Sequence, residues 1–195
     1  MIISNKHLLR ILSAILALIF ALALVSCNSQ NPPDDNSQDG SQGGSQVDAE
    51  YGNKIGDVCF AADLETFDGE AFNLSDTRGK VTVVNFWGEW CPWCLYELPD
   101  FDRVASEYES DIEIVAIHSV SGLDDGLKYA SENFPNTKMT FVKDANRGGL
   151  NYYQVLGGDG SYPRTLILDR DGVIVFEQYG AMSYDKLVEE IKKII

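Results

Sequence analysis

The sequence predicts an α/β fold, in which a mixed β-sheet is covered by helices on both faces. From about residue 54 onward, short runs of apolar and β-branched residues alternate with segments whose apolar residues recur at helical spacing. The last part of the chain contains a predicted hairpin, 165–178, and a final helix. Strands that alternate with helices and are closed by a hairpin and a helix are typical of such a mixed sheet.

The elements before the main sheet are predicted to form an N-terminal β-hairpin extension. Segments 58–60 and 67–74 have the apolar content of strands. Asp68-Gly69 is a dipeptide that favours the tight turn of a hairpin. We therefore expect these two segments to pair with each other.

The main sheet and its helices follow in order along the chain. Runs of Val and Ile predict buried strands, and apolar residues three and four positions apart predict helices. Pro135 ends the second helix, residues 170–172 turn the hairpin, and Ser183 is a favourable cap for the last helix. The expected strands are 81–87, 111–119, 139–142, 165–169 and 173–178, and the expected helices are 92–108, 124–134, 147–156 and 183–194.

The N-terminus has the pattern of an export signal. Lys6 and Arg10 precede an almost wholly apolar run, 11–25, which is shorter than the roughly 20 residues needed to span a bilayer. Residues 24–27, Leu-Val-Ser-Cys, resemble the lipobox of bacterial lipoproteins. The resemblance implies cleavage before Cys27 and lipid on the Cys27 sulfur, so that acyl chains anchor the protein to the membrane.

Three regions follow from this pattern. They are a signal peptide at 1–26, a lipidated and disordered acidic and polar tether at 27–53, and one folded domain at 54–195. The tether is dominated by Ser, Gln, Asn, Asp and Gly, and it has too few apolar residues to form a core. The formal net charge of the whole chain is −15, which argues against nucleic acid as a partner because phosphate binding needs a basic surface.

The most informative motif is Cys91-Pro92-Trp93-Cys94, which follows the predicted strand 81–87 across the short turn 88–90. A helix that begins at Pro92 has free N–H groups and a dipole that favour the thiolate of Cys91. Cys94 lies almost one turn further along and closer to the core. Cys91 is therefore the expected exposed, attacking thiol, and Cys94 the resolving thiol, of a thiol–disulfide exchange.

Two other interpretations of the pair compete with redox chemistry. A structural zinc site needs four ligands, and besides Cys91 and Cys94 the chain offers only Cys27, Cys59 and two His residues. A permanent disulfide suits an extracytoplasmic setting, but a bridge across so short a loop adds little stability. Redox chemistry is the favoured interpretation, and no metal is expected.

The residues around the Cys pair resemble those of a known family. Residues 85–94, Asn-Phe-Trp-Gly-Glu-Trp-Cys-Pro-Trp-Cys, resemble a thioredoxin-fold active site. Residues 95–99, Leu-Tyr-Glu-Leu-Pro, resemble the TlpA/ResA-like branch of membrane-tethered thiol–disulfide oxidoreductases in the AhpC/TSA-redoxin superfamily. With segments 55–57 and 162–165, the resemblance covers about residues 54–195. It implies a thioredoxin fold and a redox-active Cys91–Cys94 disulfide with no other cofactor.

The resemblance also implies roles for residues away from the pair. Pro163 matches the family's cis-proline opposite the disulfide, and Tyr162 before it would offer its backbone to an extended substrate segment. Glu97 matches a buried glutamate suited to exchange a proton with Cys94, the alternative being a solvated helix carboxylate. Asn85 stands where ordinary thioredoxins carry a buried Asp, and an amide cannot take that proton.

Several neighbouring residues have simpler expected places. Trp90, Pro92 and Trp93 are expected to contact substrate as an apolar rim, although Trp90 is equally compatible with packing beside the site. Glu89 is expected to be a solvated turn acid. Cys59 is expected to be a buried strand cysteine.

The implied activity is that of an extracytoplasmic, membrane-anchored monomer that reduces protein disulfides, such as those of apocytochromes c or of surface proteins. Its electrons would come from a membrane thiol carrier of the DsbD/CcdA type. One alternative is a copper-binding or copper-delivery protein that uses Cys91, Cys94 and His118, although the Cys pairs of such proteins are usually spaced by three residues. For His118 itself, a satisfied histidine at a strand end is the favoured interpretation. A further alternative is a thiol peroxidase, whose Pro-x-x-x-Thr-x-x-Cys setting this site lacks.

Overall fold

The computed structural model describes residues 51–119, 121–147 and 150–195. The predicted signal peptide, Cys27 and nearly all of the predicted tether lie outside these ranges. Within the ranges described, no helix combines the length and the hydropathy needed to cross a membrane.

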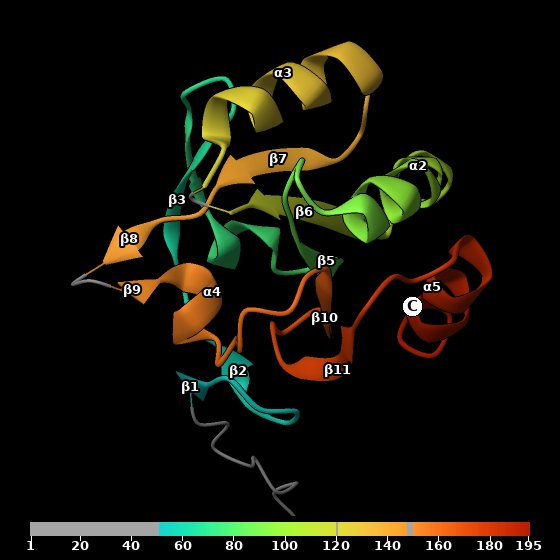
Figure 1. The fold of residues 1–195 in the computed structure, drawn as a ribbon. Helices are drawn as coiled ribbons and strands as arrows, with labels where there is room; N and C mark the ends of the chain where they lie inside the picture. The colour runs from blue at the N-terminus through green and yellow to red at the C-terminus, as the bar shows by residue number, and fades with distance from the viewer. Residues whose placement is uncertain (1–50, 120, 148–149) are drawn as a thin grey trace, which may run out of the picture. The chain divides into compact units, whose positions relative to one another are not determined.

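The described chain is built on a seven-stranded sheet with the strand order β11-β10-β5-β6-β7-β3-β4 (Figure 1). The three central strands are parallel, and an antiparallel pair flanks them on each side, which confirms the predicted mixed sheet. The strands are β3 (Asp63–Thr66), β4 (Ala71–Asn73), β5 (Val81–Trp87), β6 (Ile112–His118), β7 (Thr140–Lys143), β10 (Arg164–Leu168) and β11 (Ile174–Tyr179).

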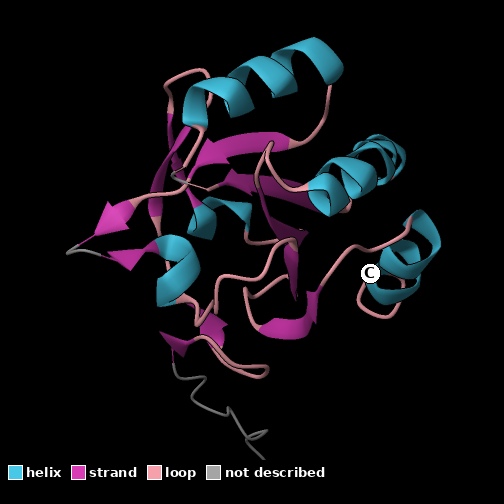
Figure 2. Ribbon diagram, viewed as in Figure 1, coloured by secondary structure: helices cyan, strands magenta, loops and turns pink. Residues whose placement is uncertain are grey.

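Helices cover both faces of this sheet (Figures 1 and 2). On one face lie α2 (Pro92–Glu107), α3 (Leu123–Asn133) and α5 (Tyr184–Ile191), and on the other lie α4 (Tyr152–Val155) and the 3₁₀ turn η2 (Leu74–Thr77). Two short strand pairs accompany the main sheet. They are β1 (Tyr51–Gly52) with β2 (Val58–Cys59), and β8 (Asn146–Arg147) with β9 (Leu150–Asn151).

Strand β5 is central to the sheet and leads directly to the Cys pair. All seven of its residues are buried, as expected for a strand that is paired on both sides and covered on both faces. Val83 and Trp87 pack on the side of α2, whereas Val84 and Phe86 pack on the side of α4. Because β5 and β6 are parallel, their carboxyl ends meet at one edge, where Trp87 and His118 are neighbours in register.

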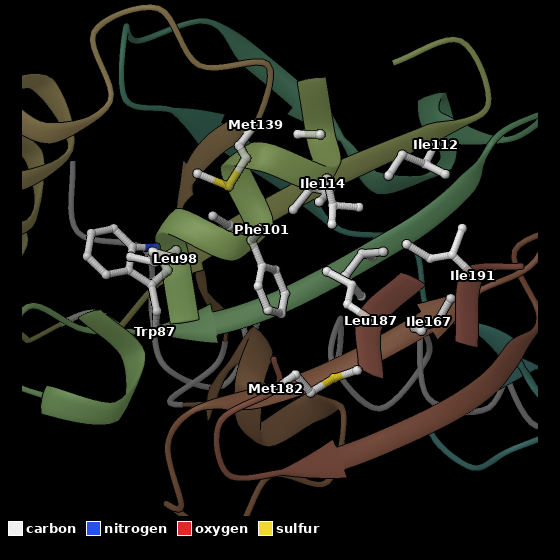
Figure 3. Packing of buried hydrophobic residues seen from close by; sticks show 14 of the residues in the cluster. Trp87, Leu98, Phe101, Ile112, Ile114, Met139, Ile167, Met182, Leu187 and Ile191 are labelled. Carbon is white, nitrogen blue, oxygen red and sulfur yellow. The ribbon is translucent and has the colours of Figure 1, made fainter. Parts of the chain in front are cut away.

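The larger core lies between the sheet and helices α2 and α5 (Figure 3). Leu98 and Phe101 of α2 pack with Leu187 of α5 over Ile114 and Ile167 of the sheet, and none of these side chains is more than 1% exposed. Burial of one such side chain is worth about 1.5–3 kcal/mol. This packing fixes how α2 lies on the sheet, and thereby where its first turn and the Cys pair are held.

The predicted N-terminal hairpin is wrong in its first strand. The turn at Asp68-Gly69 is where the sequence predicts it, but the strands that it joins are β3 and β4. Segment 58–60 does not pair with 67–74, because Val58–Cys59 forms β2 and pairs with β1. Strand β3 is difficult to predict because only one of its four residues is buried.

The helix predicted at 147–156 is also wrong in its extent. Only the single turn α4 is helical, and the residues before it pair as β8 and β9. Asn151 determines where the turn begins, because its side chain accepts the N–H of Gln154 and the Gln154 side chain accepts the N–H of Asn151. The final helix begins after Ser183 as predicted, but it ends at Ile191.

Arg164 connects strand β10 with helix α4. Its side chain is 1% exposed, and its Nε donates to Oε1 of Glu177 on β11 at 2.9 Å. Its two terminal nitrogens donate to the carbonyl oxygens of Tyr153 and Leu156, at 3.4 and 2.6 Å. These carbonyls belong to the end of α4, where a helix has no bonding partners of its own. Arg164, which directly follows Pro163, therefore links α4 to the start of β10.

Replacement of Arg164 by Leu should lower the free energy of unfolding by about 2–4 kcal/mol, because it leaves the Glu177 carboxylate and the Leu156 carbonyl without their donor. The Tyr153 carbonyl, by contrast, keeps the N–H of Gly158. Glu177→Gln keeps an acceptor for Arg164 and should cost less. Urea denaturation of the two variants compares them directly. An equal or smaller loss in Arg164→Leu would show that this contact does not support the fold.

Candidate active site

Cys91 and Cys94 form a disulfide at the start of helix α2. The backbone N–H of Cys91 donates to the carbonyl of Gly88 at 3.0 Å and closes the preceding turn. The sulfur of Cys91, the N-cap residue, accepts the N–H of Cys94 at 3.2 Å. After reduction, the same N–H and the helix dipole would stabilise negative charge on this sulfur. The geometry therefore suits an attacking thiolate at Cys91.

Both sulfur-bearing side chains are buried in this disulfide form. Cys94 is 0% exposed, as expected, but Cys91 is only 4% exposed, which corrects the prediction of an exposed thiol. The physical reason is the capping geometry, in which the Cys91 sulfur turns inward toward the first helical turn. A reacting partner therefore has to come very close to the backbone around the pair.

The peptide bond between Tyr162 and Pro163 is cis, as predicted. The ring of Tyr162 lies edge-on to Trp90, with 5.1 Å between the ring centroids. Tyr162 also packs against the buried cluster that contains Cys91 and Cys94. Residues from two distant loops are thereby brought together at the disulfide.

Tyr153 of α4 supports this loop from within the fold. Its ring stacks on Tyr162 with 4.7 Å between the centroids and 13° between the ring planes. Its hydroxyl donates to the carbonyl of Ser161 at 2.7 Å. The position of the Tyr162-Pro163 segment therefore depends on α4, and through α4 on Arg164.

The aromatic side chains around the pair are exposed. Trp90 is 50% and Trp93 65% exposed, and Pro92 is exposed beside them, so the predicted rim is open to solvent, and its contact with substrate stays a prediction. Tyr96, which the sequence analysis does not single out, is 69% exposed and lies edge-on to Trp93 at 6.1 Å. Its spacing of three residues from Trp93 on a helix is the signal that would have identified it.

Glu97 is fully buried beneath this surface. Its Oε1 accepts from Nδ2 of Asn85 at 2.8 Å, and its Oε2 accepts from the backbone N–H of Met182 at 2.8 Å. Burial raises the pKa of this carboxyl to about 7, although the bonds from Met182 and Asn85 act in the opposite direction. Glu97 is three residues after Cys94 and shares its helix face. The buried location agrees with the prediction, and the solvated alternative is wrong.

Asn85 orients this carboxyl. Its Nδ2 also donates to the hydroxyl of Thr165 at 3.1 Å, so the amide joins Glu97 to strand β10. Its Oδ1 is buried without a hydrogen-bond partner in the described structure. Asn85 thus replaces an acid with a hydrogen-bond donor, which leaves Glu97 as the titratable group beneath the pair.

Glu89 is not a solvated acid, contrary to expectation. Its Oε2 lies 2.7 Å from Nε2 of His118, and its side chain is 19% exposed. His118 is 0% exposed, and its Nδ1 has no partner in the part of the chain that the structure describes. The contact forms where Gly126 of α3 and Gly122, its N-cap residue, lie directly against these two side chains. A Cβ at Gly126 would lie 2.2 Å from Nε2 of His118, and one at Gly122 would lie 2.0 Å from Oε1 of Glu89.

This pair bears on the copper alternative. His118 is fully buried at the end of β6, and its Nε2 is directed at Glu89, so the expectation of a satisfied histidine is met at this nitrogen but not, within the described chain, at Nδ1. Among the described residues, no group of three or more His, Cys, Asp or Glu is placed to hold a metal ion. No observation in these residues favours copper binding.

Cys59 is a free, buried thiol on β2 and lies 3.5 Å from the hydroxyl of Tyr152. Burial raises the pKa of this thiol, which disfavours the reactive thiolate. Its surroundings are those of a structural cysteine.

Known proteins share sequence similarity with this chain. The model of the AhpC/TSA family matches residues 55–177. The chain is 31% identical over 129 residues to the thioredoxin-like protein YneN of Bacillus subtilis, which covers 66% of this chain and 73% of that protein. It is 30% identical over 131 residues to the thiol-disulfide oxidoreductase ResA of Bacillus thuringiensis, with 65% and 70% covered.

Solved structures are similar over nearly their whole length. The exposed lipoprotein thioredoxin of Streptococcus pneumoniae matches with a TM-score of 0.59 and 26% identity, covering 69% of this chain and 99% of that one. StoA of Bacillus subtilis, at 22% identity, matches with a TM-score of 0.54 and 67% and 95% covered, which supports the fold alone. The described domain has a thioredoxin fold, and the chain belongs to the AhpC/TSA family.

Proposed function

We propose that this thiol–disulfide oxidoreductase reduces protein disulfides on the outer face of the cell membrane, where lipid on Cys27 anchors it. The observation that carries the proposal is a disulfide held at a helix N-terminus above a buried carboxyl group, Glu97. Relatives named as thiol-disulfide oxidoreductases, and a similar structure named as an exposed lipoprotein thioredoxin, support both its activity and its location.

The reaction begins with the reduced pair. The Cys91 thiolate attacks one sulfur of the substrate disulfide, which forms a mixed disulfide and releases the first substrate thiolate. Glu97 accepts the proton of the Cys94 thiol, and the Cys94 thiolate then attacks the Cys91 sulfur. This step releases the second substrate thiolate and leaves the Cys91–Cys94 disulfide. Two electrons have then passed to the substrate, and two protons complete its thiols.

A membrane thiol carrier of the DsbD/CcdA type would return two electrons to the pair. The substrate segment would lie along the backbone of Tyr162, next to the cis bond, and against the exposed rings of Trp90 and Trp93. Disulfide-bearing surface proteins or apocytochromes c are the proposed substrates, and the protein is proposed to act as a monomer.

Replacement of Cys94 by Ala should trap substrates as mixed disulfides on Cys91, because the resolving thiol is absent. Diagonal electrophoresis of intact cells measures the trapped species. The Cys91→Ala/Cys94→Ala double variant is the control and should trap none. Failure of the single variant to trap any protein would count against disulfide reduction.

Replacement of Glu97 by Gln should slow the release of a preformed mixed disulfide by about 10- to 100-fold near pH 7, because the group that takes the Cys94 proton is lost. Stopped-flow measurement of thiol release isolates this step. A rate that is unchanged in the variant would exclude Glu97 as the proton acceptor.

The same variant should change the pH dependence of stability. The pKa of Glu97 is raised from 4.5 to about 7 in the fold, so the folded form holds the proton more tightly. The free energy of unfolding should therefore fall as pH rises from about 4.5 to 7, by an amount on the order of 3 kcal/mol from this group. Glu97→Gln should lack this part of the fall, and urea denaturation across the range measures it. Asp144, with a pKa near 6, contributes equally to both proteins.

Replacement of Cys27 by Ala should release the protein from the membrane fraction and abolish its labelling by radioactive palmitate. The reducing activity of the purified domain should not change. Retention of the variant at the membrane would contradict the lipid anchor.

A further inference from the structure

The aromatic side chains around the disulfide form an exposed rim. We define it as Trp90, Trp93, Tyr96 and Tyr162. Three of these four rings are at least half exposed, and they flank both Cys residues in sequence. Trp90 contacts Tyr162, and Trp93 contacts Tyr96, so the rings form two edge-on pairs beside the site. Exposed aromatic faces attract cations as well as apolar groups.

The segments that build the site are rich in acidic residues and contain one exposed base. No Lys or Arg occurs at 81–102, at 104–127 or at 148–163. The first range contains β5 and the first part of α2. The second range contains Gly122, which lies against Glu89, and the third range ends at Pro163. Arg103, near the far end of α2, is paired with Glu107.

Among the described residues, the acids of these segments that are not in an ion pair with Lys or Arg are Glu89, Glu97, Asp100, Asp102, Asp124, Asp125 and Asp159. Glu107, Glu109, Asp111 and Glu113 pair with Arg103, Lys138, Arg170 and Lys80, in that order.

Arg164, the base nearest to Pro163 in sequence, does not offset this charge at the surface. It is 1% exposed and paired with Glu177, and its remaining donors are bonded to carbonyl groups of α4. A substrate cannot reach it. These three ranges therefore place no exposed positive charge at the rim.

Glu89 lies in the turn before Cys91, two residues from the attacking cysteine. Its Oε2 is 2.7 Å from Nε2 of the buried His118, and its side chain is 19% exposed. An acidic side chain is therefore fixed beside the Cys pair by a contact within the fold.

We propose that the site selects disulfides in cationic polypeptide segments, with Lys or Arg on either side of the reacting Cys. This inference rests on the proposed function. Carboxylates at the site attract such a segment by Coulomb forces, and the exposed rings hold its ammonium or guanidinium groups by cation–π contact. Charge complementarity of this kind acts mainly on the rate of association. A segment with Asp or Glu in the same positions is repelled.

The test uses three disulfide-bonded peptides of one sequence, in which the residues beside the Cys are Lys, Ser or Glu. The probe is the rate of their reduction by the reduced domain, expressed as kcat/KM. Each rate is divided by the rate with dithiothreitol, because flanking charge alters the reactivity of the peptide disulfide itself. We expect the Lys peptide to exceed the Glu peptide by roughly tenfold or more at low salt. The difference should shrink to about twofold at 1 M salt, where the screening length is roughly 3 Å.

Variants then assign the preference to the site. Glu89→Gln removes the charge but keeps an acceptor for His118, and it should lower the Lys-to-Glu ratio severalfold. Trp93→Ala, at an exposed position, should lower the rate with the Lys peptide more than that with the Ser peptide. Asp171→Asn is the matched control for net charge. It lies in the turn between β10 and β11, at the end of β10 away from Pro163, and should leave the ratio unchanged.

Equal normalised rates for the three peptides would overturn this proposal. So would an equal loss of preference in Glu89→Gln and Asp171→Asn, since the effect would then be one of overall charge. If none of the peptides is reduced, including the Ser peptide, the proposed reductase function fails instead. The two failures are therefore distinguishable.

Discussion

The site depends above all on the buried carboxyl group of Glu97, because it joins three elements that are distant in sequence. The residue belongs to α2, and its two oxygens accept from Asn85 on β5 and from the backbone of Met182 before α5. A buried polar group without partners costs about 1–3 kcal/mol, so these bonds hold the three elements in one arrangement. The same arrangement places a titratable group on the face of α2 that carries Cys94.

Burial and hydrogen bonding act on this group in opposite directions. Desolvation disfavours the carboxylate, whereas the N–H groups of Met182 and Asn85 favour it, and the balance leaves the pKa at about 7. A group with this pKa can both gain and lose a proton near neutral pH. An Asp in place of Asn85 would set two acids against each other in the same buried space. The amide avoids this repulsion and keeps the carboxyl group oriented.

Those features of the fold that depend on local pattern could be predicted from the sequence. Strand β5 and the start of α2 agree with their predicted positions. The strand is a mainly apolar run of seven residues, and the helix begins at a proline that follows its capping residue. Strand β3 could not, since it has one buried residue and is a strand through its pairing with β4 and β7. The Glu89–His118 contact joins residues 29 apart and needs the close approach of α3 at Gly126. Only the three-dimensional structure reveals it.

The negative charge at the site also bears on the direction of electron flow. The first turn of α2 stabilises a thiolate at Cys91, but the carboxylate of Glu89 opposes it, and so does Glu97 above its pKa of about 7. These charges destabilise the reduced, thiolate form and leave the uncharged disulfide almost unaffected. A pair whose reduced form is less stable gives up its electrons more readily. The acidic surroundings on which the proposed selection of cationic segments rests would therefore also support the proposed transfer of electrons from the Cys pair to its substrate.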